Sequence, residues 1–386
     1  MVSMKSDSKR LPTLYFLSYL PLGMIYPYLV QELELRSIAQ IGILLAMPPF
    51  VQMFLGPLWG WLADWSQRSV LVLQMAVWIS ILGLTALTNG PAEWAWLAML
   101  VYSIGWAPIA ALMDAITLEL LQRDERSLSS VPPKTVHYGS IRMWGSVGYL
   151  VGVAIIGLMT QFLMGWGLKS GTIATIILGL FTFFLPPVHV EIQRPNRQAV
   201  WSLLQNRTLR WILLCAGLHF SVHLGNSVYI VSHAKRLNIP EVWASLAIVL
   251  GVLVEIVVFQ CARKFEHYAP QSLFLSACLL AIPRWVLMLM THSILGLCVA
   301  QALHGITFGV FWLAAVRMVK AITPSAIAST GQSLLSTSVG GIGAVIGMYG
   351  ASWIVDNFGT HSFYGVSIGI ACLASLGALR LKWLTN

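Results

Sequence analysis

Charged residues are scarce in this sequence. Only 10% of its 386 residues are charged, whereas 57% are hydrophobic, and the mean hydropathy is +0.77. Soluble domains carry about 25% charged residues. So few charges cannot cover the surface of a water-soluble protein of this size. The composition therefore excludes a soluble domain and indicates a protein that resides in a lipid bilayer.

Paired cysteines and basic clusters are also missing. The five cysteines lie in or beside apolar segments without CxxC or metal-ligand spacing, so we interpret them as small core residues. We expect neither a metal nor a cofactor. The net charge of +9 comes from basic residues scattered singly or in pairs, which argues against a nucleic-acid partner. No small-residue cleavage site closes a short apolar run, so we expect no cleaved signal peptide.

Long apolar runs dominate what is present. A helix needs about 20 apolar residues to cross the hydrocarbon core of a bilayer. We therefore predict an all-α integral membrane protein with twelve transmembrane helices, an even number that places both termini on one side. The runs fall at residues 11–30, 39–62, 69–88, 93–120, 137–163, 167–186, 209–231, 240–260, 271–290, 293–320, 325–352 and 361–382.

The distribution of basic residues predicts the orientation. Of the 23 lysines and arginines, two lie deep inside apolar runs, away from their ends, namely Arg142 and Arg284. Four lie in loops opposite the N-terminus, and the remaining 17 fall on the side of the N-terminus; the four are Arg36, Lys169, Lys235 and Arg236. Lysine- and arginine-rich loops stay in the cytoplasm. We therefore expect both termini to be cytoplasmic, in a bacterial-type inner (plasma) membrane.

The longest polar interruption, residues 187–208, divides the chain into near-equal halves. We predict an N-terminal six-helix bundle over 1–190, a cytoplasmic linker over 191–208 and a C-terminal six-helix bundle over 209–386, related by pseudo-symmetry. Duplicated six-helix halves are a common transporter plan. Glycines at spacings that allow close helix packing support the repeat. They are Gly139, Gly145, Gly148, Gly152 and Gly157 in the fifth run, and Gly331, Gly340, Gly343, Gly347 and Gly350 in the eleventh.

Few charged side chains fall inside the runs, where each costs a few kcal/mol on insertion scales. Asp114 in the fourth run and Arg142 in the fifth belong to helices joined by one cytoplasmic loop. An acid and an arginine at similar depth would pair and reduce each other's desolvation cost. The pair is either part of a substrate cavity or a fixed structural bridge.

The second half carries Glu255, Arg284 and His304 in successive runs. An acid, a guanidinium and an imidazole in a low dielectric form a titratable network. Such a network can load and release a proton at Glu255, with His304 as a relay. A static ion triad is the alternative.

Polar side chains also share one face of the seventh run, at His219, His223, Asn226 and Tyr229. We interpret this face as a hydrogen-bonding cavity wall, because no third ligand at a telling spacing supports a metal site. The first run has a tyrosine face at Tyr15, Tyr19 and Tyr26, for which packing in the core or at the lipid interface is the alternative to a cavity role.

A short motif, Gly-Trp-Leu-Ala-Asp-Trp-Ser-Gln-Arg, follows the second run at residues 60–68. Asp64 ends a helix and Arg68 follows within reach, so an acid–base contact can lock the turn. The turn resembles the signature loop of the major facilitator superfamily, G-x-L-A-D-R-x-G-R-K, and implies a gating role for Asp64 and Arg68. It matches that loop at Gly60, Leu62, Ala63, Asp64 and Arg68, and departs from it at Trp65, Gln67 and Ser69.

Within this superfamily the chain resembles the lactose permease group, and in particular its 3-phenylpropionate transporter branch. Residues 139–149, Gly-Ser-Ile-Arg-Met-Trp-Gly-Ser-Val-Gly-Tyr, are similar to R-M-F-G-C-V-G-W of the permease and to R-L-W-G-S-V of the branch. The resemblance implies that Arg142 contacts substrate, that Asp114 stands for its glutamate partner and that Tyr149 replaces a stacking tryptophan.

The second half carries the same resemblance. The segments around Glu255, Arg284 and His304 are similar to V-E-V-V-L-F, V-R-W and L-H of the branch, which implies substrate binding and proton coupling by these residues. Where the permease has its proton-carrying glutamate, three residues after the histidine, this chain and the branch have threonine, here Thr307. Any coupling must therefore rest elsewhere, and Glu255 and Asp114 are the candidates.

We interpret the chain as a secondary active transporter that uses alternating access. It would import a small organic solute, such as an aromatic acid, a sugar or a nucleoside, together with a proton. Solute would bind near the midplane between the halves, with Asp114 and Arg142 on one side and His219, His223 and Asn226 on the other. Proton-coupled efflux of sugars or amphiphiles is the alternative.

A membrane enzyme or a lipid scramblase is a rival of a different class. An enzyme needs a nucleophile, an acid and a base clustered near one interface, and the sequence shows no such cluster. A scramblase needs a polar groove that faces lipid. We expect a monomer in the bilayer whose partners are its solute and protons, and no enzymatic activity.

Overall fold

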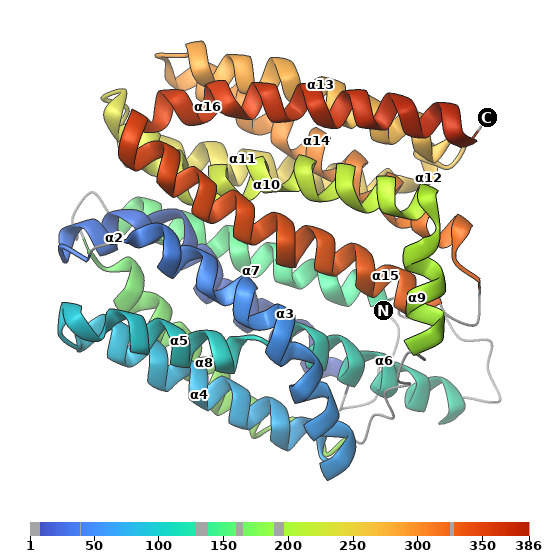
Figure 1. Cartoon of the computed structure of the whole chain (residues 1–386). Coiled ribbons are helices and arrows are strands. Elements are labelled where there is room, and N and C mark those ends of the chain that lie inside the picture. The colour runs from blue at the N-terminus through green and yellow to red at the C-terminus, as the bar shows by residue number, and fades with distance from the viewer. Residues whose placement is uncertain are drawn as a thin grey trace. The chain divides into compact units, whose positions relative to one another are not determined.

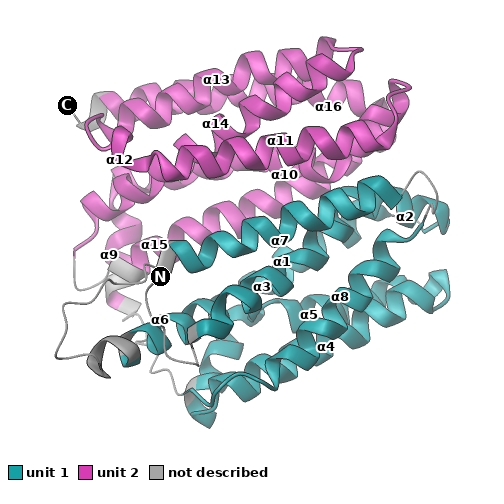
Figure 2. Ribbon diagram, turned by 180° about the vertical axis from the view of Figure 1, so that it is seen from behind, with its two compact units in different colours: residues 1–193 teal, residues 194–386 magenta. Residues whose placement is uncertain are grey.

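The computed structural model describes residues 8–38, 40–127, 138–159, 165–188, 197–324 and 328–385. Within these ranges the chain consists of helices and connecting turns. It divides into two compact units, Met1–Gln193 and Arg194–Asn386, which Figure 2 colours separately. Each unit is a bundle of long apolar helices (Figure 1).

Unit 1 begins with a helix that is interrupted where proline removes a backbone donor. Pro27 lies in a single 3₁₀ turn, Tyr26–Tyr28, which separates α1 from α2. The main helices of this unit are α1 (Leu11–Ile25), α2 (Leu29–Leu35), α3 (Ile41–Ser66), α4 (Ser69–Asn89), α5 (Ala95–Trp106), α6 (Ile109–Ser127), α7 (Tyr138–Met159) and α8 (Gly167–Thr182).

Unit 2 has a similar plan. A short helix, α9, lies in the segment predicted as a linker, and a π-helical turn, Thr337–Gly343, precedes α16. Gly359 has φ 83° and ψ 168°, so α16 is two helices that meet at a kink. The helices are α9 (Arg197–Gln205), α10 (Arg207–Arg236), α11 (Glu241–Gln260), α12 (Ala262–Phe265), α13 (Pro270–Met290), α14 (Ile294–Ile322), α15 (Ala328–Ser336) and α16 (Ala344–Thr385).

The number of membrane spans agrees with the twelve apolar runs. Ten segments of the described chain are long and apolar enough to cross a bilayer. One of them, Thr330–Lys382, has 53 residues and divides at Gly359 into two spans. The sixteen-residue helix α8 coincides with the sixth run. The all-α, multi-pass architecture predicted from the sequence is therefore confirmed.

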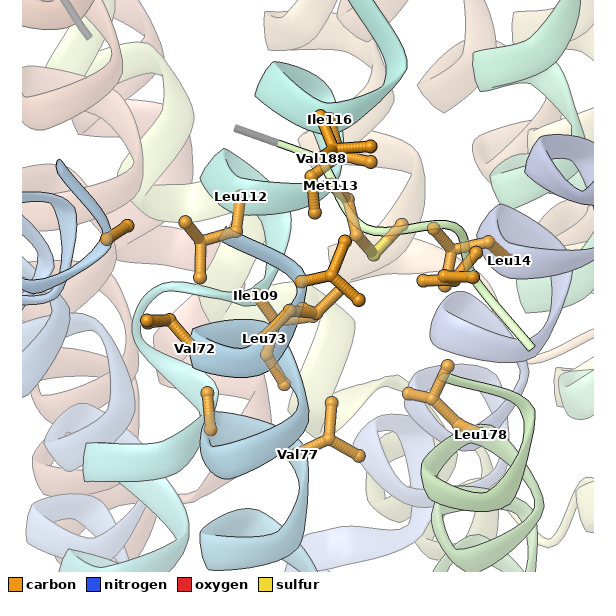
Figure 3. Close-up of a cluster of buried hydrophobic side chains, with 14 of the residues drawn as sticks. Leu14, Val72, Leu73, Val77, Ile109, Leu112, Met113, Ile116, Leu178 and Val188 are labelled. Atoms are coloured by element: carbon orange, nitrogen blue, oxygen red, sulfur yellow. The ribbon is translucent and has the colours of Figure 1, made fainter. Parts of the chain in front are cut away.

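Each unit buries its own apolar core. In unit 1, side chains from α1, α4, α6 and α8 meet in the cluster shown in Figure 3, which includes Leu14, Leu73, Leu112, Ile116 and Leu178. In unit 2, an equivalent cluster gathers around Phe274 and Phe311, both fully buried. These cores fix the helices from which the polar side chains of each unit project.

Glycines make the closest helix contacts in both units. In unit 1, a Cβ atom on Gly148 of α7 would lie 2.2 Å from the Phe16 carbonyl oxygen of α1. In unit 2, a Cβ atom on Gly347 of α16 would lie 2.1 Å from the Ser221 carbonyl oxygen of α10. A larger residue fits at neither position. The glycine repeat of the fifth and eleventh runs thus has a packing role at these two positions.

The predicted gating turn connects α3 to α4. Asp64 belongs to the end of α3, but the placement of its side chain lies outside what the structure describes. Arg68 is exposed and directly precedes α4. Gln67 occupies the glycine position of the superfamily loop and has φ +54°, which explains a preference for glycine there.

Replacing Gln67 with glycine should stabilise the protein. The left-handed backbone costs a residue with a side chain about 1–2 kcal/mol, and the greater freedom of glycine in the unfolded chain offsets part of this gain. We expect a higher unfolding temperature for purified Gln67→Gly protein. Ser66→Gly, one residue earlier in helical backbone, is the matched control and should lower it. A lower temperature for Gln67→Gly would contradict the proposed strain.

Candidate functional site

Most hydroxyl groups inside the spans are satisfied by their own helix. Ser18, Ser80 and Thr175 each donate to the carbonyl oxygen four residues earlier, at 2.8, 3.0 and 2.7 Å. This local bond satisfies a polar side chain where water is absent. Polar side chains that contact other helices, or that have no partner, are therefore the candidates for function.

Three helices of unit 1 bring an acid, an arginine and two tyrosines together. The Tyr15 hydroxyl of α1 donates to Asp114 Oδ1 of α6 at 2.5 Å. The Arg142 guanidinium carbon of α7 lies 5.6 Å from the centre of the Tyr15 ring and 4.6 Å from that of Tyr19. Tyr15 therefore contacts both members of the acid–arginine pair predicted from the sequence.

Tyr19 completes this group, because its ring lies beside the Arg142 guanidinium. Aromatic faces stabilise a guanidinium through cation–π interactions, which act on the flat face of the group and not on its N–H edge. Asp114 and Arg142 are both half-buried. The group therefore combines a carboxylate, a guanidinium and two phenolic hydroxyls at one place in unit 1.

Close packing of α1 on α7 positions this group. A Cβ atom on Gly23 of α1 would lie 2.0 Å from the Tyr149 carbonyl oxygen. Tyr149, which the sequence places in the site, is half-buried and lies two helical turns after Arg142 on the same face of α7. The third tyrosine of the predicted stripe, Tyr26, lines a small apolar cavity with Leu45 and Tyr102. Only the first part of that stripe thus reaches the polar group.

Unit 2 gathers three histidines from two helices. The rings of His219 and His223 on α10 lie 4.6 Å apart, and the His304 ring of α14 lies 5.4 Å from that of His223. His223 Nδ1 is 2.9 Å from the His219 carbonyl oxygen, and Nε2 is 3.4 Å from the Thr307 hydroxyl. The two histidines predicted on the seventh span and the one predicted on the tenth therefore form one cluster.

Asn226 connects the same face of α10 to the last span. Its side-chain oxygen accepts a hydrogen bond from the Tyr364 hydroxyl of α16 at 3.1 Å. Both side chains are buried. Tyr364 also lies edge-on to His233 and stacks at 6.1 Å from Trp285 of α13. The sequence carries no signal for Tyr364, since a lone tyrosine in an apolar run is usually a packing residue.

Arg284 of α13 is completely buried beside the histidine cluster. Its Nε donates to the Ala300 carbonyl oxygen at 3.2 Å, and its guanidinium carbon lies 3.9 Å from the Trp285 ring centre. Within the part of the chain that the structure describes, neither Nη nitrogen has a hydrogen-bond partner. The three clustered histidines and Tyr364 lie within electrostatic range of Arg284.

Glu255, the acid of the predicted triad, lies on the neighbouring pair of helices. Glu255 is half-buried on α11. Its backbone lies against α14, because a Cβ atom on Gly305 of α14 would lie 2.5 Å from the Glu255 nitrogen. Among the described residues, no ion pair joins Arg284 to an acid. The structure thus brings Arg284 and His304 together and adds His219 and His223, whereas the place of Glu255 beside them stays a prediction.

Comparisons with known proteins place this architecture among transporters. A family model described as the MFS_1 like family matches residues 9–366. The maltose permease of Geobacillus stearothermophilus is 25% identical over 86% of this chain and 84% of its own length. The probable 3-phenylpropionic acid transporter of Escherichia coli strain K12 is also 25% identical, over 82% of this chain and 80% of its own length.

A solved structure shares the fold. The crystal structure of the nucleoside transporter NupG superposes with a TM-score of 0.83 at 17% identity and covers 99% of this chain and 99% of its own. Each of the three similar proteins is named for a different class of solute.

Removing the Tyr15 hydroxyl tests the link in unit 1. Tyr15→Phe keeps the ring beside Arg142 but leaves Asp114 without this donor, so it should destabilise the protein by about 1–2 kcal/mol. A lower unfolding temperature of the purified protein is the expected observation. Tyr349→Phe, at a tyrosine of α16 that is 48% exposed, is the control and should change nothing. Equal stability of both variants and the parent would show that the hydroxyl does not support Asp114.

Proposed function

Because this chain belongs to the MFS_1 like family of membrane transporters, we propose that it is a proton symporter that imports a small organic solute by alternating access. The solute is an aromatic acid, a sugar or a nucleoside. These are the classes named for the 3-phenylpropionic acid transporter, the maltose permease and NupG. As a member of this family the chain is a multi-pass transporter and not an enzyme.

One observation carries the proposal: each unit holds buried or half-buried charged side chains inside its spans. Asp114 and Arg142 in unit 1, and Arg284 with the histidine cluster in unit 2, are the groups that a packed apolar bundle does not need. Ionisable residues inside spans are costly and mark pathways for substrates or protons. We assign substrate contact to Arg142, Asp114, Tyr149, His219, His223 and Asn226.

Proton coupling is assigned to Glu255, Arg284 and His304. Thr307 is buried and hydrogen-bonds within its own helix, so it offers no carboxylate for a proton. Glu255 is an acid on α11, and its backbone lies at the contact with α14. We propose that Glu255 carries the proton that Thr307 cannot. The Asp64–Arg68 turn is assigned to gating.

The excess of basic residues on one side supports an inner-membrane location with both termini in the cytoplasm. We propose that the transporter acts as a monomer, with one route for solute and proton through the same chain.

Uptake of labelled solute into oriented vesicles, with and without an imposed pH gradient, tests the direction of solute transport. Accumulation driven by an inward proton gradient is expected, whereas solute export driven by that gradient would show an efflux antiporter.

Replacing Arg142 should abolish solute binding without loss of folded protein. Its guanidinium is held against two tyrosine rings and supplies the cationic donor group of unit 1. We expect no measurable binding to purified Arg142→Ala protein that still elutes as a single folded species. Arg123→Ala is the control, because Arg123 forms an exposed pair with Glu119 on α6. Unchanged affinity in Arg142→Ala would remove Arg142 from the site.

Replacing Glu255 should separate accumulation from exchange. Glu255→Gln keeps the size of the side chain but cannot ionise, so net proton-driven accumulation should stop while solute exchange across the membrane continues. Vesicle assays of uptake and of counterflow measure the two activities. Glu266→Gln, at an exposed acid after α12, should behave as the parent. A Glu255→Gln transporter that still accumulates solute against its gradient would clear Glu255 of the coupling role.

A further inference from the structure

One end of unit 2, where α10 begins and α16 ends, carries exposed arginines that no described acid offsets (Figure 1). Arg207 and Arg210 lie in the first turn of α10, and Arg380 lies near the end of α16. Residues 197–236 and 357–386 contain neither aspartate nor glutamate. The positive charge at this end of the unit is therefore available to a partner outside the chain.

A tryptophan fixes the position of Arg380. Its guanidinium carbon lies 4.8 Å from the centre of the Trp211 ring of α10. The two helices touch one turn deeper, where a Cβ atom on Gly377 of α16 would lie 2.5 Å from the Cys215 sulfur of α10. Gly377 precedes Arg380 by three residues and Cys215 follows Trp211 by four, so this close contact brings the two side chains against each other.

The stacked arrangement leaves the N–H edge of Arg380 open. The indole covers one flat face of the guanidinium, whereas the donors point outward along its edge. Arg380 makes no hydrogen bond to a residue that the structure describes. Two parallel N–H groups of a guanidinium match two oxygens of a phosphate. Arg380 is therefore a fixed and exposed donor for an oxyanion.

An apolar surface continues from this pair toward the middle of the spans. On α10, Leu214 follows Trp211 and is 53% exposed. On α16, Leu373 and Leu376 share a face with Arg380 and are 59% and 64% exposed. Exposed leucines within spans contact acyl chains, and tryptophan is enriched at the level of the lipid headgroups. The order leucine, tryptophan, arginine thus matches the acyl chains, the interface and the phosphate of a phospholipid.

The charges favour a phospholipid with a net negative charge. Arg207 lies one turn before Trp211 on the same face of α10, and Arg210 flanks it. The ammonium of a zwitterionic headgroup would be repelled by these arginines, whereas an anionic headgroup carries no such group. The preceding helix, α9, adds Trp201, which is 66% exposed, while its Leu203 is anchored in the core of unit 2.

We propose that Arg380, Trp211 and Arg207 form a binding site for the phosphate group of an anionic phospholipid of the surrounding bilayer. The acyl chains lie along the exposed leucines of α10 and α16. None of these residues belongs to the groups assigned to solute, proton or gating, so the site goes beyond the proposed transport function. A lipid bound there holds the first and last spans of unit 2 together at their ends.

Lipid titration of the purified full-length protein, followed by native mass spectrometry, tests the site. The probes are phosphatidylglycerol and phosphatidylcholine with identical acyl chains. Each arginine near an anionic headgroup contributes about fivefold in affinity, so phosphatidylglycerol should bind about tenfold or more tightly than phosphatidylcholine. Equal affinities would overturn the proposal. Release of bound phosphatidylglycerol by inorganic phosphate would show a site for a soluble anion and would overturn it as well.

Replacing Arg380 separates this site from the general charge of the protein. Arg380→Gln should lower the affinity for phosphatidylglycerol about fivefold and leave that for phosphatidylcholine unchanged. Arg263→Gln removes the same charge at an exposed arginine of α12 and is the matched control, for which no change is expected. An equal loss of affinity in both variants would show attraction by net charge alone and would refute the site.

Replacing Trp211 tests the stack without changing the charge. Trp211→Leu leaves every arginine in place but removes the ring that positions Arg380, so the preference for phosphatidylglycerol should fall severalfold. Trp353→Leu, at an α16 tryptophan that is 54% exposed, is the control and should keep the preference of the parent. An unaltered preference in Trp211→Leu contradicts the assignment, even where Arg380→Gln does not fold.

Discussion

Helices α1 and α7 approach so closely that one methyl group on Gly148 would collide with the backbone of Phe16. In a bilayer, apolar side chains gain little by leaving lipid, so helices associate through close contacts of this kind. The approach brings Tyr15 and Tyr19 of α1 against Arg142 of α7. In unit 2, Gly347 of α16 meets the backbone of α10 at Ser221, which lies between His219 and His223 along that helix. The polar groups of each unit therefore depend on close helix contacts at glycines.

The two units treat their buried charge in different ways. In unit 1, Asp114, Tyr15 and Arg142 form a group in which an acid and a base share a tyrosine. In unit 2, Arg284 has three histidines as its electrostatic neighbours and no acid paired with it among the described residues. An acid offsets the charge of an arginine in the group of unit 1, whereas no described acid offsets that of Arg284.

Much of this arrangement could be predicted from the sequence, because charge inside an apolar run is a strong signal. Arg142, Arg284 and the histidines of α10 were identified in this way, and the spacing of glycines indicated which helices pack closely. The depth of a residue along its helix can be read from the sequence, but the neighbouring helix that its side chain faces cannot. The place of Glu255 in the expected triad therefore stays a prediction: α11 meets α14 at the Glu255 backbone, and Arg284 forms no ion pair with an acid among the described residues.

The contacts of the aromatic residues could not be predicted from the sequence either. Tyr15 and Tyr26 lie on the same stripe of the first span, yet one contacts Asp114 and the other lines an apolar cavity. Trp285 and Tyr364 belong to runs where a ring is usually a packing residue, so their polar atoms gave no signal. The break of the first span at Pro27 and the kink at Gly359 also depend on the surrounding bundle, which decides how the interrupted helices continue.

The hydroxyls that bond within their own helices have a consequence for the evolution of this chain. Because Ser80 and Thr175 bond to the preceding turn of their own helices, these hydroxyls need no polar partner on another helix. A side chain at a helix–helix contact can then be substituted without breaking hydrogen bonds that several helices share. Local bonding of this kind therefore leaves positions at helix–helix contacts open to substitution.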